Sequence, residues 1–123
     1  MVVVMASSRR NQSRENEMQT IVVEANFQKE VLENPEPVLV EFGADWCGAS
    51  HMLAPILEQL REEFKEQIKI VRVDIDACSR VAAEYGIQDI PMLVFFKNGQ
   101  LVDQIISLAP RPIIANKLRA LLR

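Results

Sequence analysis

The chain has few of the residues that build cross-linked, membrane-spanning or nucleic-acid-binding proteins. Only two of its 123 residues are cysteines, Cys47 and Cys78, whereas a disulfide scaffold needs more. No apolar run approaches the roughly 20 residues that cross a bilayer, so we do not expect a membrane partner. The 14 Lys and Arg residues are outnumbered by 17 Asp and Glu residues. Because no basic stripe is present, we do not expect a nucleic-acid partner either.

What is present is the composition of one globular domain. Hydrophobic residues make up 49% of the chain and charged residues 25%, and this length can bury one core. Residues 1–17 are rich in Ser, Arg, Asn and Gln, so we predict a disordered extension there and one domain over 18–123. A transit peptide and a true start at Met18 are alternatives for the extension. The cysteine usage favours a reducing compartment, and we expect a cytoplasmic protein.

Apolar patterns along the domain alternate between strand and helix. Periodicity predicts strands over 19–23, 38–42, 69–75, 92–96 and 101–106, and helices over 26–32, 52–64, 79–85 and 112–122. Asn26 and Ser79 are candidate helix caps, and Gly86 is a candidate helix stop. Asn98-Gly99 is a strong hairpin signal between two strands. The order predicts an α/β fold, in which a mixed central sheet is flanked by helices.

Cys47 follows a nearly continuous apolar strand and precedes a long helix. A thiol at a helix N-terminus faces unpaired backbone N–H groups and the positive end of the helix dipole, and both favour the thiolate. We therefore predict that Cys47 is a nucleophile. The alternative is an inert buried cysteine that acts as a small hydrophobic residue.

Several stretches together resemble one known family. Residues 38–48, Val-Leu-Val-Glu-Phe-Gly-Ala-Asp-Trp-Cys-Gly, closely resemble the active-site strand and turn of thioredoxins. The likeness continues at 52–55 (Met-Leu-Ala-Pro), 85–91 (Tyr-Gly-Ile-Gln-Asp-Ile-Pro) and 96–99 (Phe-Lys-Asn-Gly). It covers about residues 19–122 with even spacing. The resemblance implies the thioredoxin fold and thiol–disulfide exchange at Cys47.

The resemblance also assigns a substrate groove around the thiol. Ile90-Pro91 corresponds to the family's cis-proline, which lies against the active-site cysteine and offers a backbone edge to an extended substrate. Trp46 would shield the thiol and offer a contact surface. The alternatives are a trans proline that opens a strand and a tryptophan that only fills the core. Pro55 would be the kink in the active-site helix, where local rules alone predict a break.

Two charged residues match a pair that thioredoxins keep behind the active site. Glu41 stands where the family has a buried carboxylate, usually Asp, and Arg72 stands where it has a basic partner, usually Lys. A carboxylate in an apolar strand is costly unless it is paired or protonated. A role at the site and simple ion pairing are both open.

The main departure from the family is Ser50, which replaces the second cysteine. A dithiol reductase releases its product when the second thiol attacks the mixed disulfide, and serine cannot perform that step. The Ser50 hydroxyl can instead donate a hydrogen bond to the Cys47 thiolate. Attack, mixed-disulfide formation and isomerisation by reverse exchange remain available to Cys47.

Further departures surround the turn. Ala49 replaces the usual proline after Gly48, and His51 stands where the family usually has Lys. His51 is either a solvated helix residue or a group that tunes the thiolate near neutral pH. Ser107 replaces a glycine that lines the groove, so its side chain narrows the groove or adds a polar contact.

Cys78 is not expected to replace the missing thiol. It begins the predicted helix over 79–85, and in the family that point lies away from the active turn. A disulfide needs Cα atoms within about 7 Å. We predict a buried structural thiol, with a regulatory or intermolecular thiol as the alternative.

These observations predict a monothiol oxidoreductase or isomerase that forms mixed disulfides through Cys47. Its partners would be protein disulfides or thiols, with a reductase or glutathione as the external thiol source, no bound cofactor or metal, and a monomeric chain. The first alternative is a redox-inactive binding or adaptor module that uses the groove. A dimer linked by an iron–sulfur cluster or glutathione and a purely structural protein are the others.

Overall fold

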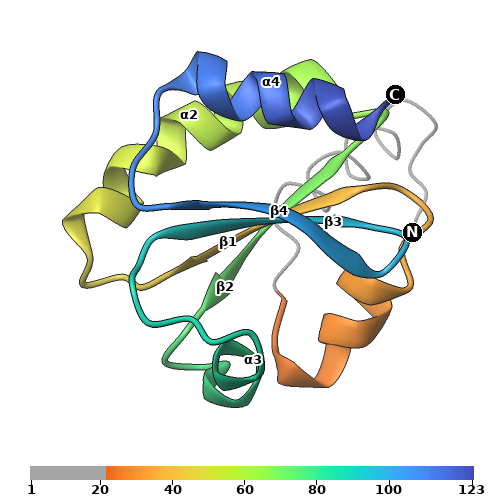
Figure 1. Ribbon diagram of the computed structural model, residues 1–123. Coiled ribbons are helices and arrows are strands. Elements are labelled where there is room, and N and C mark those ends of the chain that lie inside the picture. The colour runs from red at the N-terminus through yellow and green to blue at the C-terminus, as the bar shows by residue number, and fades with distance from the viewer. Residues whose placement is uncertain (1–21) are drawn as a thin grey trace, which may run out of the picture.

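A computed structural model describes residues 22–123 and shows one four-stranded sheet between two layers of helices (Figure 1). The predicted strand over 19–23 is not found in the described part, since Val22 and Val23 lie in no strand. The rest of that range lies outside the described residues, and so does the predicted extension over 1–17.

The sheet is mixed, as predicted, and its strand order is β2-β1-β3-β4. Strand β1 (Val38–Gly43) pairs in parallel with β2 (Lys69–Asp74). It pairs antiparallel with β3 (Met92–Lys97), which in turn pairs antiparallel with β4 (Gln100–Ile106). Every residue of β1 is buried, because it is a central strand covered on both faces. The C-terminal end of this buried strand leads directly into the Cys47 turn.

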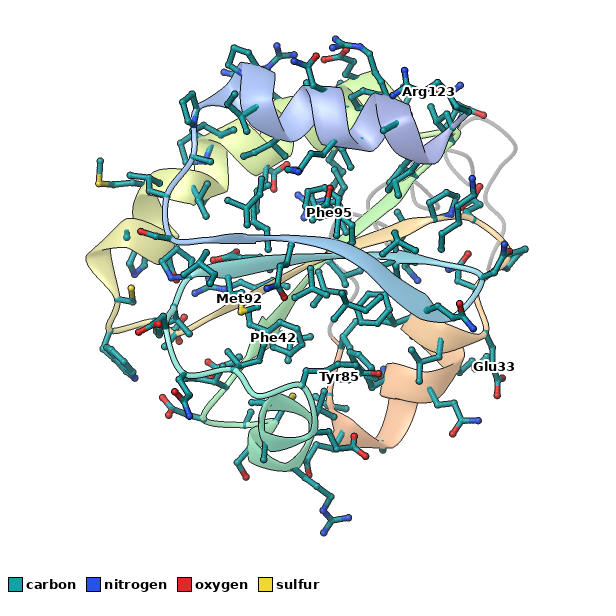
Figure 2. All side chains as sticks on the ribbon, in the orientation of Figure 1. Glu33, Phe42, Tyr85, Met92, Phe95 and Arg123 are labelled. Atoms are coloured by element: carbon teal, nitrogen blue, oxygen red, sulfur yellow. The ribbon has the colours of Figure 1, made fainter. Side chains whose placement is uncertain are left out.

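Helices cover the two faces of the sheet (Figure 1). Helices α2 (Gly48–Phe64) and α4 (Arg111–Leu121) lie on one face, and α3 (Ser79–Glu84) lies on the other with the N-terminal helical segment. Successive strand side chains point to opposite faces, so the buried residues form two clusters. Figure 2 shows Phe95 on the α2 and α4 side, and Phe42 and Tyr85 on the α3 side.

The N-terminal helical segment differs from the predicted helix over 26–32. It consists of a 3₁₀ turn, η1 (Glu24–Asn26), and a π-helical stretch, η2 (Gln28–Leu32). Asn26 is not the N-cap that the sequence predicts: the N-cap of η1 is Val23, whose N–H donates a 2.8 Å hydrogen bond to the Asn26 Oδ1. The apolar pattern located the segment but did not indicate its hydrogen-bond type; its Phe27 and Val31 are buried in the core.

Helix α2 begins earlier than the apolar pattern predicts, at Gly48 instead of Met52. The Met52 side chain is 61% exposed and is not part of the buried face. Pro55 lies inside the helix without ending it. The break that local rules predict does not occur: the proline removes one helical hydrogen bond, and its ring disturbs only the turn before it.

Smaller differences occur at the ends of the other elements. The N-cap of α3 is Cys78 and not Ser79, whereas Gly86 ends the helix with a φ of 64° as predicted. The β3–β4 hairpin turns at Asn98 and Gly99, whose φ values of 54° and 79° fit the mirror-image turn that hairpins favour. On α4, the apolar residue Ile113 is exposed.

Among residues 22–123, no helix is both long and apolar enough to cross a membrane.

Candidate active site

Cys47 is the N-cap residue of α2, at the point where the chain leaves the buried strand β1. The Ser50 backbone N–H is the main cause that lowers the pKa of the Cys47 thiol, and the Ser50 hydroxyl and the Ala49 N–H add to it. Burial and the charge of Glu41 oppose this change. The side chain is partly exposed, so the sulfur combines thiolate character with access from solvent.

The first turn of α2 leaves the approach to Cys47 open. Gly48 is exposed, and a Cβ added to it would meet no atom within 4 Å. Ala49 is partly exposed beside it. On the other side of the thiol, the Cys47 Sγ lies 3.9 Å from the Ile90 carbonyl oxygen. Gly48 and Ala49 lie beside the sulfur because α2 starts directly after the cysteine.

Ser50 and Glu41 lie behind the thiol and are fully enclosed. Their exposed fractions are 0% and 2%, and they are the buried polar residues of the described chain. Burial is the main cause that raises the pKa of Glu41, while Arg72 and the Ser50 hydroxyl act in the opposite direction. The Ser50 Oγ and the Glu41 Oε2 have no partner at hydrogen-bonding geometry, although the hydroxyl is close enough to lower the pKa of both Glu41 and Cys47.

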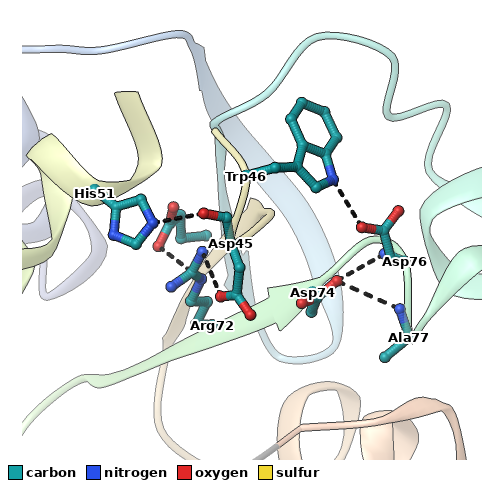
Figure 3. A network of polar contacts seen from close by, with 8 residues as sticks. Asp45, Trp46, His51, Arg72, Asp74, Asp76 and Ala77 are labelled. Carbon is teal, nitrogen blue, oxygen red and sulfur yellow. Dashed lines mark hydrogen bonds and ion pairs between the residues drawn. The ribbon is translucent and has the colours of Figure 1, made fainter. Parts of the chain in front are cut away.

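Arg72 on β2 faces two carboxylates at once (Figure 3). Its Nε lies 3.8 Å from the Glu41 Oε1, and its Nη2 lies 3.8 Å from an oxygen of Asp45. Both separations are too long for hydrogen bonds, so the contacts are ion pairs only. The predicted pair of Glu41 and Arg72 is therefore brought together, with Asp45 as a third member that the sequence pattern did not indicate.

The turn is fixed from two sides by contacts that sequence reasoning missed (Figure 3). The Trp46 indole Nε1 donates a 2.8 Å hydrogen bond to the Asp76 Oδ2 in the loop after β2. Asp74 holds that loop by accepting from the Asp76 N–H at 2.8 Å. His51 Nε2 lies 2.6 Å from the Asp45 carbonyl oxygen. Because a carbonyl oxygen only accepts, the hydrogen is on Nε2, and this ring nitrogen points to the turn.

Ile90, Pro91 and Ser107, which the resemblance assigns to a groove, are linked to one another on the other side of Cys47. The Ile90–Pro91 peptide bond is cis, the isomer that the resemblance implies, and Pro91 is buried. Ser107 is exposed with a φ of 77°, a region that favours glycine. Its N–H donates a 2.8 Å hydrogen bond to the Pro91 carbonyl oxygen. This bond ties the end of β4 to the proline beside the thiol.

Cys78 is separated from this group. It is 1% exposed in the cluster on the α3 side of the sheet, and its Sγ lies 3.5 Å from the Val22 carbonyl oxygen. Burial is the main cause that raises the pKa of its thiol. Both cysteines are free. The second thiol of the chain is therefore neither activated nor directed to the Cys47 turn.

Comparison with known proteins decides the family. The sequence matches the family model described as Thioredoxin over residues 18–120. The chain belongs to the thioredoxin family. It is 43% identical to Thioredoxin 1 of Synechococcus elongatus over 97 residues, which are 79% of this chain and 91% of that protein. It is 44% identical to Thioredoxin C-2 of Corynebacterium nephridii over 90 residues, 73% of this chain and 83% of that protein.

A third relative, the thioredoxin of Pyropia yezoensis, is 42% identical over 97 residues that cover 79% of this chain and 91% of that protein. Membership of the thioredoxin family places the chain among the thiol–disulfide oxidoreductases, which act on protein thiols and disulfides. The match also confirms the fold predicted from the motifs.

One local signal could have revealed more of this thioredoxin-family site. Gly43 is a glycine inside a buried strand, a position that often marks a close approach of other groups. A Cβ there would lie 2.5 Å from the Ser50 Oγ and 2.6 Å from the Glu41 Oε2. Asp76 offered no such signal, because it is 30 residues from Trp46 in sequence and meets it only in the folded chain.

Proposed function

We propose that this thioredoxin-family protein exchanges disulfides through Cys47 alone and depends on an external thiol, such as glutathione, to complete the reaction. One observation carries the proposal: the pKa of Cys47 is lowered at the start of α2, whereas Ser50 occupies the place of a second thiol. Cys78 is buried on the other side of the sheet and does not replace it.

The first step follows from the thiolate of Cys47. The sulfur attacks one sulfur of a substrate disulfide, a bond forms between Cys47 and that sulfur, and the other substrate sulfur leaves as a thiolate that takes a proton from water. The helix N-terminus that stabilises the thiolate also makes Cys47 a good leaving group in the reverse direction. Formation and reversal of the mixed disulfide are therefore both accessible.

The second step needs a thiol from outside the chain. A glutathione thiolate attacks the Cys47 sulfur of the mixed disulfide and releases the substrate as a thiol, which leaves Cys47 bound to glutathione. A second glutathione then frees Cys47 and forms oxidised glutathione, so that two glutathione thiols reduce one substrate disulfide. When a thiol of the substrate itself attacks instead, Cys47 is released and the disulfide is rearranged without net reduction.

The surface around Cys47 favours protein substrates over small ones. Trp46 is 68% exposed beside the thiol, and such an aromatic surface favours contact with a polypeptide. Ile90 offers its backbone next to the Cys47 sulfur. We propose an extended protein segment with a disulfide or thiol as substrate. We propose that the protein works as a monomer in the cytoplasm. This compartment is reducing, so glutathione is present there to complete the cycle.

Single-turnover reduction of insulin, with products read by intact-protein mass spectrometry, tests the proposal. Without glutathione, the reduced wild-type protein should stop as a covalent adduct with an insulin chain, and added glutathione should release it. Ser50→Cys should release the insulin chain without glutathione, because it restores the second thiol. Cys78→Ala is the matched control and should behave as wild type. No adduct and no glutathione-dependent turnover would rule the proposal out.

A binding or adaptor module remains the second candidate, and a specific surface favours it. Met52 and Ile56 of α2 and the residues at 108–110 line an apolar pocket of about 370 Å³. A partner held by this surface would not need the thiol. Capture of a binding partner that survives Cys47→Ser unchanged would support this candidate, and loss of binding would count against it.

A further inference from the structure

Strand β4 is an apolar edge of the described sheet. It comes last in the strand order, and β3 is the described strand that pairs with it. Leu101, Val102 and Ile106 of β4 are exposed although they are apolar. An edge strand offers unpaired backbone N–H and C=O groups to any other extended chain. The sequence of β4 therefore favours pairing with a further strand unless something prevents it.

Two residues near the end of β4 turn their backbone groups away from β3. The Ser107 N–H donates to the Pro91 carbonyl oxygen, so the backbone groups of Ser107 face the β3 side. In an antiparallel pair, such residues alternate with residues whose N–H and C=O point outward. The irregular step in this pair lies nearer the hairpin, at Val102, so the alternation holds from there to Ser107. Gln104 and Ile106 therefore present their N–H and C=O groups at the outer edge.

Asp103 occupies one of these outward groups. Its Oδ1 accepts a 2.8 Å hydrogen bond from the Gln104 N–H, and its Oδ2 accepts a 2.8 Å hydrogen bond from the Lys117 Nζ of α4. The Lys117 bond is the main cause that lowers the pKa of Asp103, and the Gln104 N–H adds to it, so the carboxylate is ionised at neutral pH. A strand that paired here would have to break the bond to Gln104 and take an ion pair out of water.

A second copy of this chain would fit the edge if Asp103 did not occupy it. A two-fold axis pairs a residue with itself, so two antiparallel β4 strands can meet with each Gln104 opposite the other. The exposed Val102 of one copy then lies across from the exposed Ile106 of the other, and such apolar pairs stabilise a sheet. In the same register Ser107 faces Leu101 of the other copy. The second copy would therefore lie beside the surface around Cys47.

We infer that Asp103 protects the β4 edge: it holds the outward N–H of Gln104, so that a second copy of this chain does not pair with β4 and cover the surface around Cys47. Lys117 keeps the carboxylate in place from α4. The protection accounts for a monomer that has an exposed apolar edge. It does not involve the thiol, so it goes beyond the proposed function and can fail independently of it.

Sedimentation velocity from micromolar to millimolar chain concentration tests this role. The wild type should remain a monomer. Asp103→Ala should dimerise with a dissociation constant at least about tenfold lower than that of the wild type, because it frees the Gln104 N–H and removes the charge. Glu63→Ala is the matched control, since Glu63 is also a carboxylate paired with cations, Arg111 and Arg119, but lies on α2. It should behave as the wild type.

A proline at position 104 separates strand pairing from general apolar association. Asp103→Ala combined with Gln104→Pro lacks the N–H that pairing needs, and edge strands tolerate proline where the N–H faces solvent. This double variant should return to a monomer. If it does not fold, amide hydrogen exchange of Asp103→Ala decides: the amides of Gln104 and Ile106 should become better protected as the concentration rises.

Three results would overturn the inference. They are an Asp103→Ala protein that stays monomeric at millimolar concentration, a Glu63→Ala protein that dimerises equally well, and a dimer whose Gln104 and Ile106 amides stay unprotected. Insulin reduction keeps the two proposals apart. Asp103→Ala should match the wild type at low concentration and lose rate per chain where it dimerises, and an unchanged rate in the dimer would show that β4 pairing leaves the surface around Cys47 open, against the inference. An inactive wild-type monomer would reject only the proposed function.

Discussion

The indole Nε1 of Trp46 donates a 2.8 Å hydrogen bond to the Asp76 Oδ2, which joins the active-site turn to the loop after β2. Trp46 is 68% exposed, so little packing holds the ring and this bond sets its orientation. A hydrogen bond to a charged acceptor is worth about 1.5–3 kcal/mol when well formed, and less at an exposed site. The orientation of the Trp46 ring, an exposed contact surface beside Cys47, thus depends on Asp76, a residue outside the active-site turn.

Asp76→Ala should loosen the Trp46 ring. The chain has one tryptophan, so its fluorescence anisotropy reports on this side chain alone. We expect a lower anisotropy in Asp76→Ala and an almost unchanged value in Asp76→Asn, whose side-chain oxygen still accepts the bond. The same anisotropy in all three proteins would show that the hydrogen bond does not hold the ring in solution.

Glu41→Gln should become more stable relative to wild type as the pH rises. Burial raises the pKa of Glu41 in the folded state, so the folded protein holds this proton more tightly than the unfolded chain, whose glutamate has a pKa of about 4.3. The wild type therefore loses stability from that value up to the folded pKa, at up to about 1.4 kcal/mol per pH unit.

Urea unfolding at pH 4 and pH 8 measures this difference. The two proteins should have similar free energies of unfolding at pH 4, where Glu41 is mostly neutral in both states, and Glu41→Gln should be the more stable at pH 8. A difference that is independent of pH would contradict the raised pKa.

Ser107→Gly should stabilise the fold. The φ of Ser107 is 77°, and a side chain in the left-handed region costs about 1–2 kcal/mol. Glycine removes that cost but adds freedom to the unfolded chain, so we expect a net gain of about 0.5–1 kcal/mol in the free energy of unfolding. Ser107→Ala keeps the Cβ and is the matched control. Equal urea midpoints for the two variants would show that the backbone at this position is not strained.

Gly43→Ala should disturb the site more than its single methyl group suggests. The new Cβ would lie 2.5 Å from the Ser50 Oγ and 2.6 Å from the Glu41 Oε2, so both side chains must move. We expect a loss of about 1–3 kcal/mol in the free energy of unfolding, together with slower alkylation of Cys47.

Gly48→Ala serves as the control for that prediction, because a Cβ there meets no atom within 4 Å. It should leave the stability unchanged or raise it slightly, since alanine favours a helix more than glycine does. A Gly43→Ala protein as stable and as reactive as Gly48→Ala would mean that the space at Gly43 is not needed.

Local pattern predicted most of the fold because each element has a strong local signal. Continuous apolar residues located β1, and the Asn98-Gly99 pair located the hairpin, where both residues have positive φ. Ends of elements were less predictable. Helix α2 extends back to Gly48 through a turn with only small and polar residues, and these have no apolar period to reveal them.

The sequence likewise predicted some features of the candidate site and not others. Cys47 could be placed at a helix start from the sequence, because a buried strand and a long helix meet there. The pairing of Arg72 with Glu41 followed from the resemblance, but its second pairing with Asp45 did not. Contacts between a turn and a distant loop depend on how the strands are placed side by side, and local patterns carry no information on that.

The sequence by itself determined the family, the mixed sheet, the position of Cys47 and the absence of a second thiol in its turn, since these depend on residue identity and short-range periodicity. Only the tertiary structure decided that Cys78 lies on the opposite face of the sheet from α2, that Trp46 is held by Asp76, and that Glu41 and Ser50 converge at Gly43. Each of these depends on how the helices and loops are placed against the sheet, and that placement is set by packing across the whole core.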